Sequence, residues 1–186
     1  MDATNMKNDN ATHDSVAFVV KKFADGWYVL TVNSNNPDCH KAPGGRNTSH
    51  LEEKPGDTLR AKLRVECGIE IHESPKAFFV ARSFHPPKHF FYIADGENIS
   101  QDILERRTVG KTTSFWLPIR KFWMDPASKK NLLWAQRTAF QVLVTEILSR
   151  DREFSREYRD LIRDFRGQGK KGGLLGFFER IFKARW

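Results

Sequence analysis

Two early runs of the chain are mainly apolar and are separated by a turn signal. The runs are "SVAFVVKKF" at 15–23 and "GWYVLTVNS" at 26–34, and both are rich in β-branched and aromatic residues. Asp25 and Gly26 stand at the junction, and this pair is typical of tight hairpin turns. The pattern predicts a β-hairpin.

A spacing of four between apolar residues appears over residues 55–67, "PGDTLRAKLRVEC". One apolar stripe recurs at that spacing: Leu59, Leu63 and Cys67. Such a stripe predicts a helix with one buried face. Pro55 suits the first helical position and Gly68 suits the residue after the end. The helix is therefore expected to span 55–67.

The middle of the chain predicts further strands and one long helix. "AFFVARSF" at 77–84 and "HFFYIADG" at 89–96 predict a second hairpin, and "TSFWLPIRKF" at 113–122 predicts another strand. "NLLWAQRTAFQVLVTEILSR" at 131–150 is apolar on one side and predicts a helix. We expect an α+β fold, an α-β-α sandwich in which a mixed sheet lies between the 55–67 helix and this second helix.

After residue 150 the chain becomes basic and amphipathic, so 150–186 is expected to be a helical C-terminal extension. Apolar residues of "FSREYRDLIRDF" fall at helical spacing, and its alternating acids and bases indicate a solvated face. "GQGKKGG" at 167–173 is expected to be a flexible joint. The segment 174–186 again has an apolar stripe beside basic residues. It is expected to dock on the chain's own core, on a partner protein or on an anionic membrane surface.

Length and charge refine this organisation. The 186 residues suit one domain with extensions: a disordered leader at 1–14, a domain at 15–149 and the extension at 150–186. Of the net charge of +8, eleven Lys or Arg and six Asp or Glu in the last 37 residues contribute +5. The nearly balanced core argues against specific nucleic-acid binding.

The cysteines and the apolar runs bear on the compartment. Cys39 and Cys67 have no partner at metal-ligand spacing, so they are expected to be reduced thiols and not zinc ligands. No apolar run reaches the roughly 18 residues that span a bilayer, and no signal peptide is visible. We expect a cytoplasmic protein, with a peripheral membrane position left open through 174–186.

The segment from Ala42 to Ile69 contains the candidate chemistry. "PGG" at 43–45, Glu53 before Pro55 and "ECGI" at 66–69 occur in order around the predicted helix. Carboxylates beside such a helix are what phosphate-anhydride chemistry needs, because Mg²⁺ neutralises the diphosphate and activates water. The segment resembles the signature of the Nudix hydrolase family, and "FWLPI" resembles a strand that often follows it.

Several positions depart from the signature that the segment resembles. The interval between Gly45 and Glu53 encloses seven residues where the family has five. Ala61 stands where the family has Arg, and Lys62 and Val65 stand where it has Glu. Of the three helix carboxylates that usually hold the metal, Glu66 alone remains. The resemblance is therefore to a Nudix-like domain with a degenerate signature.

The resemblance implies two alternative functions. The first is a Nudix-type pyrophosphohydrolase that acts on or binds a nucleotide-like, nucleoside diphosphate-linked small molecule, with Mg²⁺ or Mn²⁺ as the cofactor. The second is a catalytically inactive Nudix-fold module for binding or assembly, whose C-terminal helices dock to a partner or membrane.

The resemblance also implies the candidate site residues. Glu66 and Glu53 are the candidate catalytic and metal residues, although Glu53 also suits a role at the helix end. The candidate ligand-binding residues are Gly44, Gly45, Lys62 and Arg64. Substitute carboxylates are available at Glu52, Asp57, Asp95 and Glu97. His85 and His89 flank a Pro-Pro turn and are interpreted as loop residues, not ligands.

Overall fold

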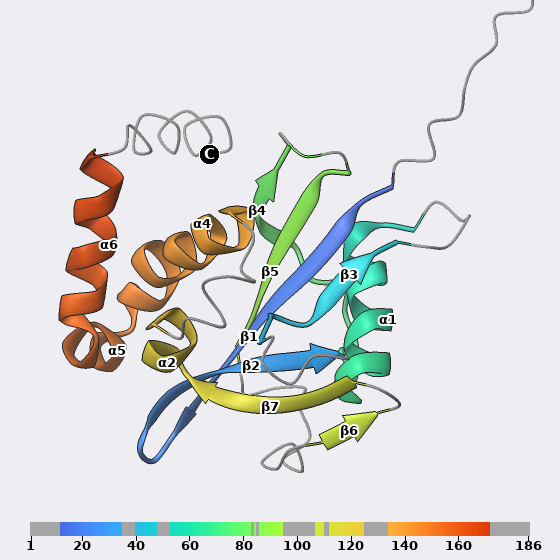
Figure 1. The fold of residues 1–186 in the computed structure, drawn as a ribbon, viewed down its shortest axis with the longest axis horizontal. Helices are drawn as coiled ribbons and strands as arrows, with labels where there is room; N and C mark the ends of the chain where they lie inside the picture. The colour runs from blue at the N-terminus through green and yellow to red at the C-terminus, as the bar shows by residue number, and fades with distance from the viewer. Residues whose placement is uncertain are drawn as a thin grey trace, which may run out of the picture. The chain divides into compact units, whose positions relative to one another are not determined.

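The computed structural model describes residues 12–34, 40–47, 53–82, 84, 86–94, 107–109, 112–124 and 134–171. Contacts divide the chain into two compact units, Met1–Gln136 and Arg137–Trp186. The first unit contains the sheet, and the described part of the second is helical (Figure 1). No helix in the described part of the chain is both long and apolar enough to span a bilayer.

A mixed seven-stranded sheet forms the first unit, so the expected α+β fold class is confirmed. Its strands are β1 (Asp14–Phe23), β2 (Gly26–Ser34), β3 (Gly44–Arg46), β4 (Ala77–Ala81), β5 (Lys88–Ala94), β6 (Arg107–Val109) and β7 (Thr112–Pro118). The strand order is β4-β5-β1-β2-β7-β6, and β3 pairs with β1. The pairing of β1 with β5 is parallel and the other pairings are antiparallel.

The first predicted hairpin is present as β1 and β2, which pair from Phe23 opposite Gly26 up to Val20 opposite Val29. Gly26 has φ 138°, a backbone conformation that favours glycine. Residue 14, assigned to the leader from the sequence, begins β1, whereas residues 1–11 lie outside the described residues. The second hairpin is present as β4 and β5.

The helix predicted over 55–67 is α1 (Pro55–Cys67), with the expected bounds. Pro55 occupies its first turn, and Gly68 ends it in the left-handed conformation with φ 66°. The predicted stripe of Leu59, Leu63 and Cys67 is fully buried. It packs against one face of the sheet, whose contributing residues include Ala17, Val19, Leu30, Val32, Phe91 and Ile93.

The predicted strand over 113–122 is wrong in its second half. β7 ends at Pro118, and α2 (Ile119–Met124) follows at once and packs against β2 and β7. Ile119 and Phe122 are buried at a spacing of three, which a helix places on one side. The proline ends the ladder because it has no N–H to donate.

The C-terminal unit is helical throughout its described part. Its elements are most of α4 (Trp134–Val142), which begins in the first unit, the π-helical turn η2 (Leu143–Ile147), the 3₁₀ turn η3 (Leu148–Arg150), α5 (Arg152–Glu157) and α6 (Arg159–Lys171). The predicted 131–150 helix is thus present from Trp134 but changes type after Val142. Its expected position across the sheet from α1 stays a prediction.

The flexible joint predicted at 167–173 is wrong over 167–171, because α6 continues to Lys171. Gly167 and Gly169 each cost about 1 kcal/mol of helix propensity relative to alanine. Gln168 and Lys170 favour helix, and the buried apolar stripe upstream stabilises the turns that precede them. The segment 174–186, with its predicted docking role, lies outside the described residues.

Candidate functional site

The two glycines of "PGG" lie on a strand and not in a turn. β3 runs antiparallel to the start of β1, with Gly44 opposite Val16 and Gly45 opposite Ser15. Gly44 has φ 133°, and a Cβ on it would lie 2.1 Å from the carbonyl oxygen of Ser15. Only glycine fits this position, because any side chain would enter the backbone of β1.

Glu66 reaches from the last turn of α1 to this strand. Its Oε2 accepts a hydrogen bond of 2.9 Å from the backbone N–H of Gly44. The side chain is half-buried. A carboxylate that accepts from a backbone N–H makes a charge-assisted bond, which is stronger than a neutral one. This bond joins two segments that are 22 residues apart in the sequence.

Lys62 lies one turn before Glu66 on the same side of α1. Its Nζ is 3.9 Å, and its Cε 3.6 Å, from where a Cβ on Gly45 would stand. The Lys62 side chain therefore lies over β3, the glycine strand, where Gly45 is half-buried. Within the described part of the chain, Lys62 forms no ion pair.

Glu53 lies at the opposite end of α1. Its carboxylate accepts a hydrogen bond of 3.3 Å from Thr58, whose hydroxyl is also 2.9 Å from Nε2 of His13. With a rise of about 1.5 Å per residue, roughly 16 Å along the axis separates Pro55 from Glu66. The structure therefore does not bring the two candidate carboxylates together. Glu53 instead stands at the positive end of the helix dipole.

Arg64 also lies away from the glycine strand. It points from another side of α1 and pairs with Glu70 at 3.5 Å. Asp57, one of the proposed substitute carboxylates, pairs with Arg60 at 3.7 Å and accepts from the hydroxyl of Ser74. The other substitutes, Glu52, Asp95 and Glu97, lie outside the described residues.

The sequence analysis missed a polar cluster where β1, β3, β5 and α1 begin or end. The buried carboxylate of Asp14 pairs with Lys88 and, at 3.3 Å, with Arg46. The rings of His13 and His89 meet edge to face at 5.8 Å. His13 and Asp14 were assigned to the leader because the polar residues before them mask the start of the strand.

The pKa of His89 is lowered in this cluster. Burial is the main cause, since it disfavours the charged imidazolium, and the positive charges of His13 and Arg82 add to it. His89 lies on β5, where its ring contacts that of His13. Its interpretation as a loop residue is therefore wrong. His85 lies outside the described residues.

The described residues do not fit a divalent metal. Among them, no three His, Cys, Asp or Glu side chains come together in a group that could hold an ion. Glu66 already accepts from Gly44, and the ammonium of Lys62 lies beside the same strand. Two unit charges about 4 Å apart interact by about 4 kcal/mol at an effective dielectric of about 20, so Lys62 disfavours a cation there.

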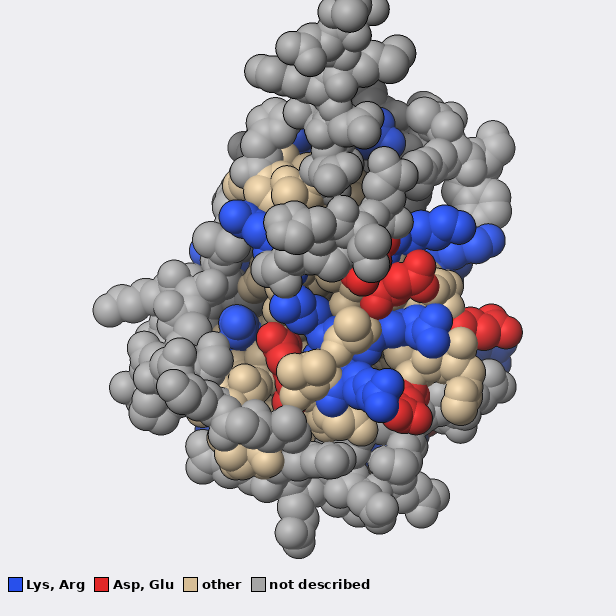
Figure 2. Space-filling view, turned by 90° about the vertical axis from the view of Figure 1, so that its right-hand side faces the viewer, with Lys and Arg blue, Asp and Glu red and all other residues tan. Residues whose placement is uncertain are grey.

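The surface over this site is mainly basic. Figure 2 shows the α1 side of the molecule, where blue Lys and Arg side chains predominate over red ones in the centre. Val65, at a position where the family signature has Glu, is 65 % exposed on this helix. A surface with this sign favours an anion near α1.

Comparisons with known proteins find similarity only among solved structures. No protein-family model and no curated protein sequence matches the chain. Solved structures that do match include a NUDIX-family hydrolase from Clostridium perfringens, with 13 % identity over 70 % of this chain and 97 % of that one and a TM-score of 0.45. An ADP-ribose pyrophosphatase from Streptococcus suis matches with 14 % identity over 73 % and 94 % and a TM-score of 0.42. The Ap4A hydrolase of C. elegans matches with 11 % identity over 70 % and 98 % and a TM-score of 0.40.

Identities and TM-scores this low transfer no activity or substrate to this chain. The chain itself has an α+β unit in which a glycine strand and a carboxylate-bearing helix meet on a mixed sheet. This fold is similar to the Nudix fold, and the residues from Ala42 to Ile69 resemble the Nudix signature in a degenerate form.

Proposed function

We propose that this chain is a Nudix-like binding module that takes a nucleoside diphosphate-linked ligand without divalent-metal hydrolysis. The observation that supports it most directly is the position of Lys62. Its ammonium lies over the half-buried Gly45 on the strand that pairs with β1. Among the described residues it forms no ion pair, and such an ammonium is suited to a phosphate.

Glu66 has a positioning role in this proposal. Its hydrogen bond to Gly44 holds β3 against the end of α1, and this keeps Lys62 over Gly45. The carboxylate is then engaged with protein and not with a metal ion. Glu53 supports the other end of the helix through Thr58. The ligand class itself comes from the Nudix-like fold, and the phosphate contact comes from Lys62.

Isothermal titration of the full chain tests the proposal, with ADP-ribose and diadenosine tetraphosphate as probes. We expect one of these to bind in the presence of EDTA, and the affinity to be unchanged when Mg²⁺ is added. Lys62→Ala should weaken binding by about tenfold, because it removes one charged contact to phosphate. Arg64→Ala is the matched control: it removes a cation from another side of α1 and should change the affinity by less than about twofold.

Hydrolysis is measured in parallel on the same samples. We expect no Mg²⁺- or Mn²⁺-dependent cleavage by the unmodified chain. The double variant Lys62→Glu with Val65→Glu restores the family's carboxylates at exposed or half-buried positions and should gain affinity for Mn²⁺. Metal-dependent cleavage by the unmodified chain that Glu66→Gln abolishes would show instead that it is a Nudix-type hydrolase.

A further inference from the structure

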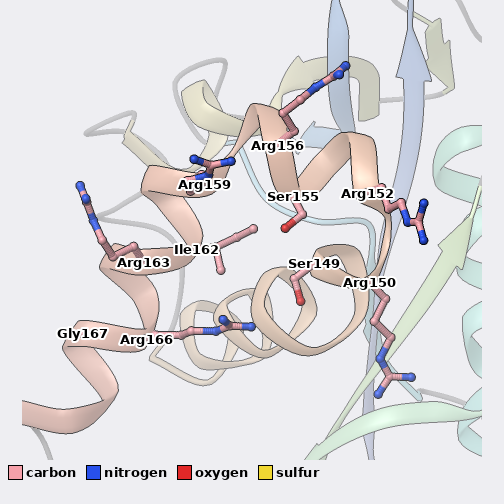
Figure 3. A pocket seen from close by; sticks show the side chains of 10 residues that line it. All are labelled: Ser149, Arg150, Arg152, Ser155, Arg156, Arg159, Ile162, Arg163, Arg166 and Gly167. Carbon is pink, nitrogen blue, oxygen red and sulfur yellow. The ribbon is translucent and has the colours of Figure 1, made fainter.

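The C-terminal unit contains a cavity of about 710 Å³ between η3, α5 and α6 (Figure 3). Two serines, Ile162, Gly167 and six arginines line it, and no acidic residue does. The arginines are Arg150, Arg152, Arg156, Arg159, Arg163 and Arg166. All of these residues belong to the C-terminal unit, so the cavity is separate from the glycine strand and α1.

The helical repeat explains how arginines gather in a segment that is almost neutral. Residues 150–166 contain six arginines and five acids. Along α5 and α6 the arginines recur every three or four residues from Arg152 to Arg166, and an acid follows each of the first four directly. A helix turns about 100° per residue, so each acid points about a quarter turn away from the arginine before it. The acidic and the basic side chains therefore lie on different sides of α5 and α6.

The apolar stripe holds this arrangement in place. Phe154 stacks on Tyr158 with ring centroids 4.6 Å apart, and Phe165 meets Phe140 at 6.4 Å. Both helices are thereby anchored by their buried side, and the arginine side is left outward. Asp151, next to the cavity, accepts from the backbone N–H groups of Glu153 and Phe154 and so caps α5.

Two of the lining side chains donate to the same backbone carbonyl. Ser149 donates to the carbonyl of Thr145 at 2.5 Å, and Arg166 donates to the same carbonyl at 3.4 Å. In Figure 3 the side chains of Ser155, Ile162 and Arg166 point into the space between the helices. The side chains of Arg150, Arg152, Arg156 and Arg163 extend outward around it. A ligand would therefore meet a hydroxyl and an arginine inside and further guanidinium groups at the mouth.

Most arginines around the cavity form no ion pair among the described residues. Within residues 134–171, which the structure describes, none of the five exposed arginines other than Arg166 forms an ion pair. Guanidinium groups stay charged at every physiological pH. Their forked N–H groups match the oxygens of phosphate, and each phosphate can engage more than one of them. A ligand with several phosphates would relieve the mutual repulsion of the rim.

We propose that this arginine cavity binds a compact polyphosphorylated molecule, either free in solution or as the headgroup of a phosphorylated lipid. Its volume lies within the roughly 300–1,000 Å³ of small-molecule sites. No aromatic side chain lines it, so it lacks the stacking platform that single-stranded nucleic acids use. The aromatic residues of this segment are buried instead, Phe154, Tyr158 and Phe165 among them.

The test is isothermal titration of the full chain with inositol hexakisphosphate and with tripolyphosphate, in buffer of physiological salt. We expect at least one probe to bind. The double variant Arg159→Gln with Arg163→Gln should weaken that binding by at least about tenfold, since it removes two charged contacts. The matched control, Arg60→Gln with Lys76→Gln, removes two exposed positive charges from the first unit and should change the affinity by less than about twofold.

A second arm separates the two sources of the phosphates. Flotation is measured with phosphatidylcholine vesicles with and without phosphatidylinositol 4,5-bisphosphate. Flotation that requires the phosphorylated lipid, and that both the arginine variant and soluble inositol hexakisphosphate suppress, assigns the headgroup. Binding of the soluble probe without such flotation assigns the free molecule.

Three results would overturn the proposal. The first is that neither probe binds the unmodified chain. The second is that the Arg159→Gln/Arg163→Gln variant binds as well as the unmodified chain. The third is that single-stranded RNA binds in an arginine-dependent way while both probes fail. If the glutamine variant loses its helical circular dichroism signal, Arg159→Lys with Arg163→Lys replaces it. Lysine keeps the positive charge but lacks the forked N–H groups of the guanidinium, so the affinity for the probe should still fall.

Discussion

At the scale of single residues, the adjacent Gly44 and Gly45 are glycines for different reasons. Gly44→Ala places a Cβ 2.1 Å from the Ser15 carbonyl at φ 133°, so we expect a loss of roughly 3 kcal/mol or more in the free energy of unfolding. Gly45→Ala meets only the end of the flexible Lys62 side chain at 3.6 Å, and should change stability by less than about 0.5 kcal/mol.

Urea unfolding of both variants, followed by circular dichroism, measures the difference. If β3 pairs with β1 as described, Gly44→Ala must lower the free energy of unfolding much more than Gly45→Ala does. Equal losses would mean that β3 does not lie against β1 in the register that places Gly44 opposite Val16.

At the scale of elements, the junction where β1, β5 and α1 begin should make stability depend on pH. The folded protein favours neutral His89, because burial, His13 and Arg82 lower its pKa. An unfolded histidine has a pKa of about 6.5 and takes up a proton as the pH falls through that value. The unfolded state then binds more protons, so the free energy of unfolding falls from about pH 6.5 down to the folded-state pKa.

Thermal melting between about pH 7.5 and 5.5 tests this prediction. His89→Gln removes the titrating group and should flatten the decrease in melting temperature relative to the unmodified chain. His72→Gln is the control, because His72 is exposed and lies outside the cluster. A decrease that persists unchanged in His89→Gln would assign the pH dependence to another group.

At the scale of the whole molecule, the division into two compact units predicts separate responses to core mutations. Phe165 is buried in the C-terminal unit against Phe140, so Phe165→Ala should cost about 3–5 kcal/mol there. Hydrogen exchange should accelerate in α5 and α6, while the amides of β1 and β2 keep their protection.

Phe79→Ala is the matched variant in the sheet, where Phe79 packs against Phe90 with ring centroids 5.8 Å apart. It should accelerate exchange in β4 and β5 and leave α6 protected. If either variant accelerates exchange equally throughout the chain, the two units unfold as one cooperative body and the prediction is wrong.

Local patterns in the sequence were sufficient for the elements whose causes are local. Two apolar, β-rich runs around Asp25-Gly26 predicted the first hairpin. The spacing of four predicted α1 with its bounds, because Pro55 and Gly68 act on their own backbone. The ordered motif around that helix also predicted the Nudix-like fold. The same reasoning failed at α2 and over residues 167–171, where packing of neighbouring segments overrides the local preference.

The site depended on contacts between segments that are far apart in the chain. Spacing alone treats Lys62 and Arg64 as equivalent cations, but the fold directs one to the glycine strand and the other to Glu70. The alternating charges after residue 150 suggested a solvated helix face. Only the folding of η3, α5 and α6 against one another gathers the arginines around a cavity, because a helix separates neighbours in sequence and its packing decides which side remains open.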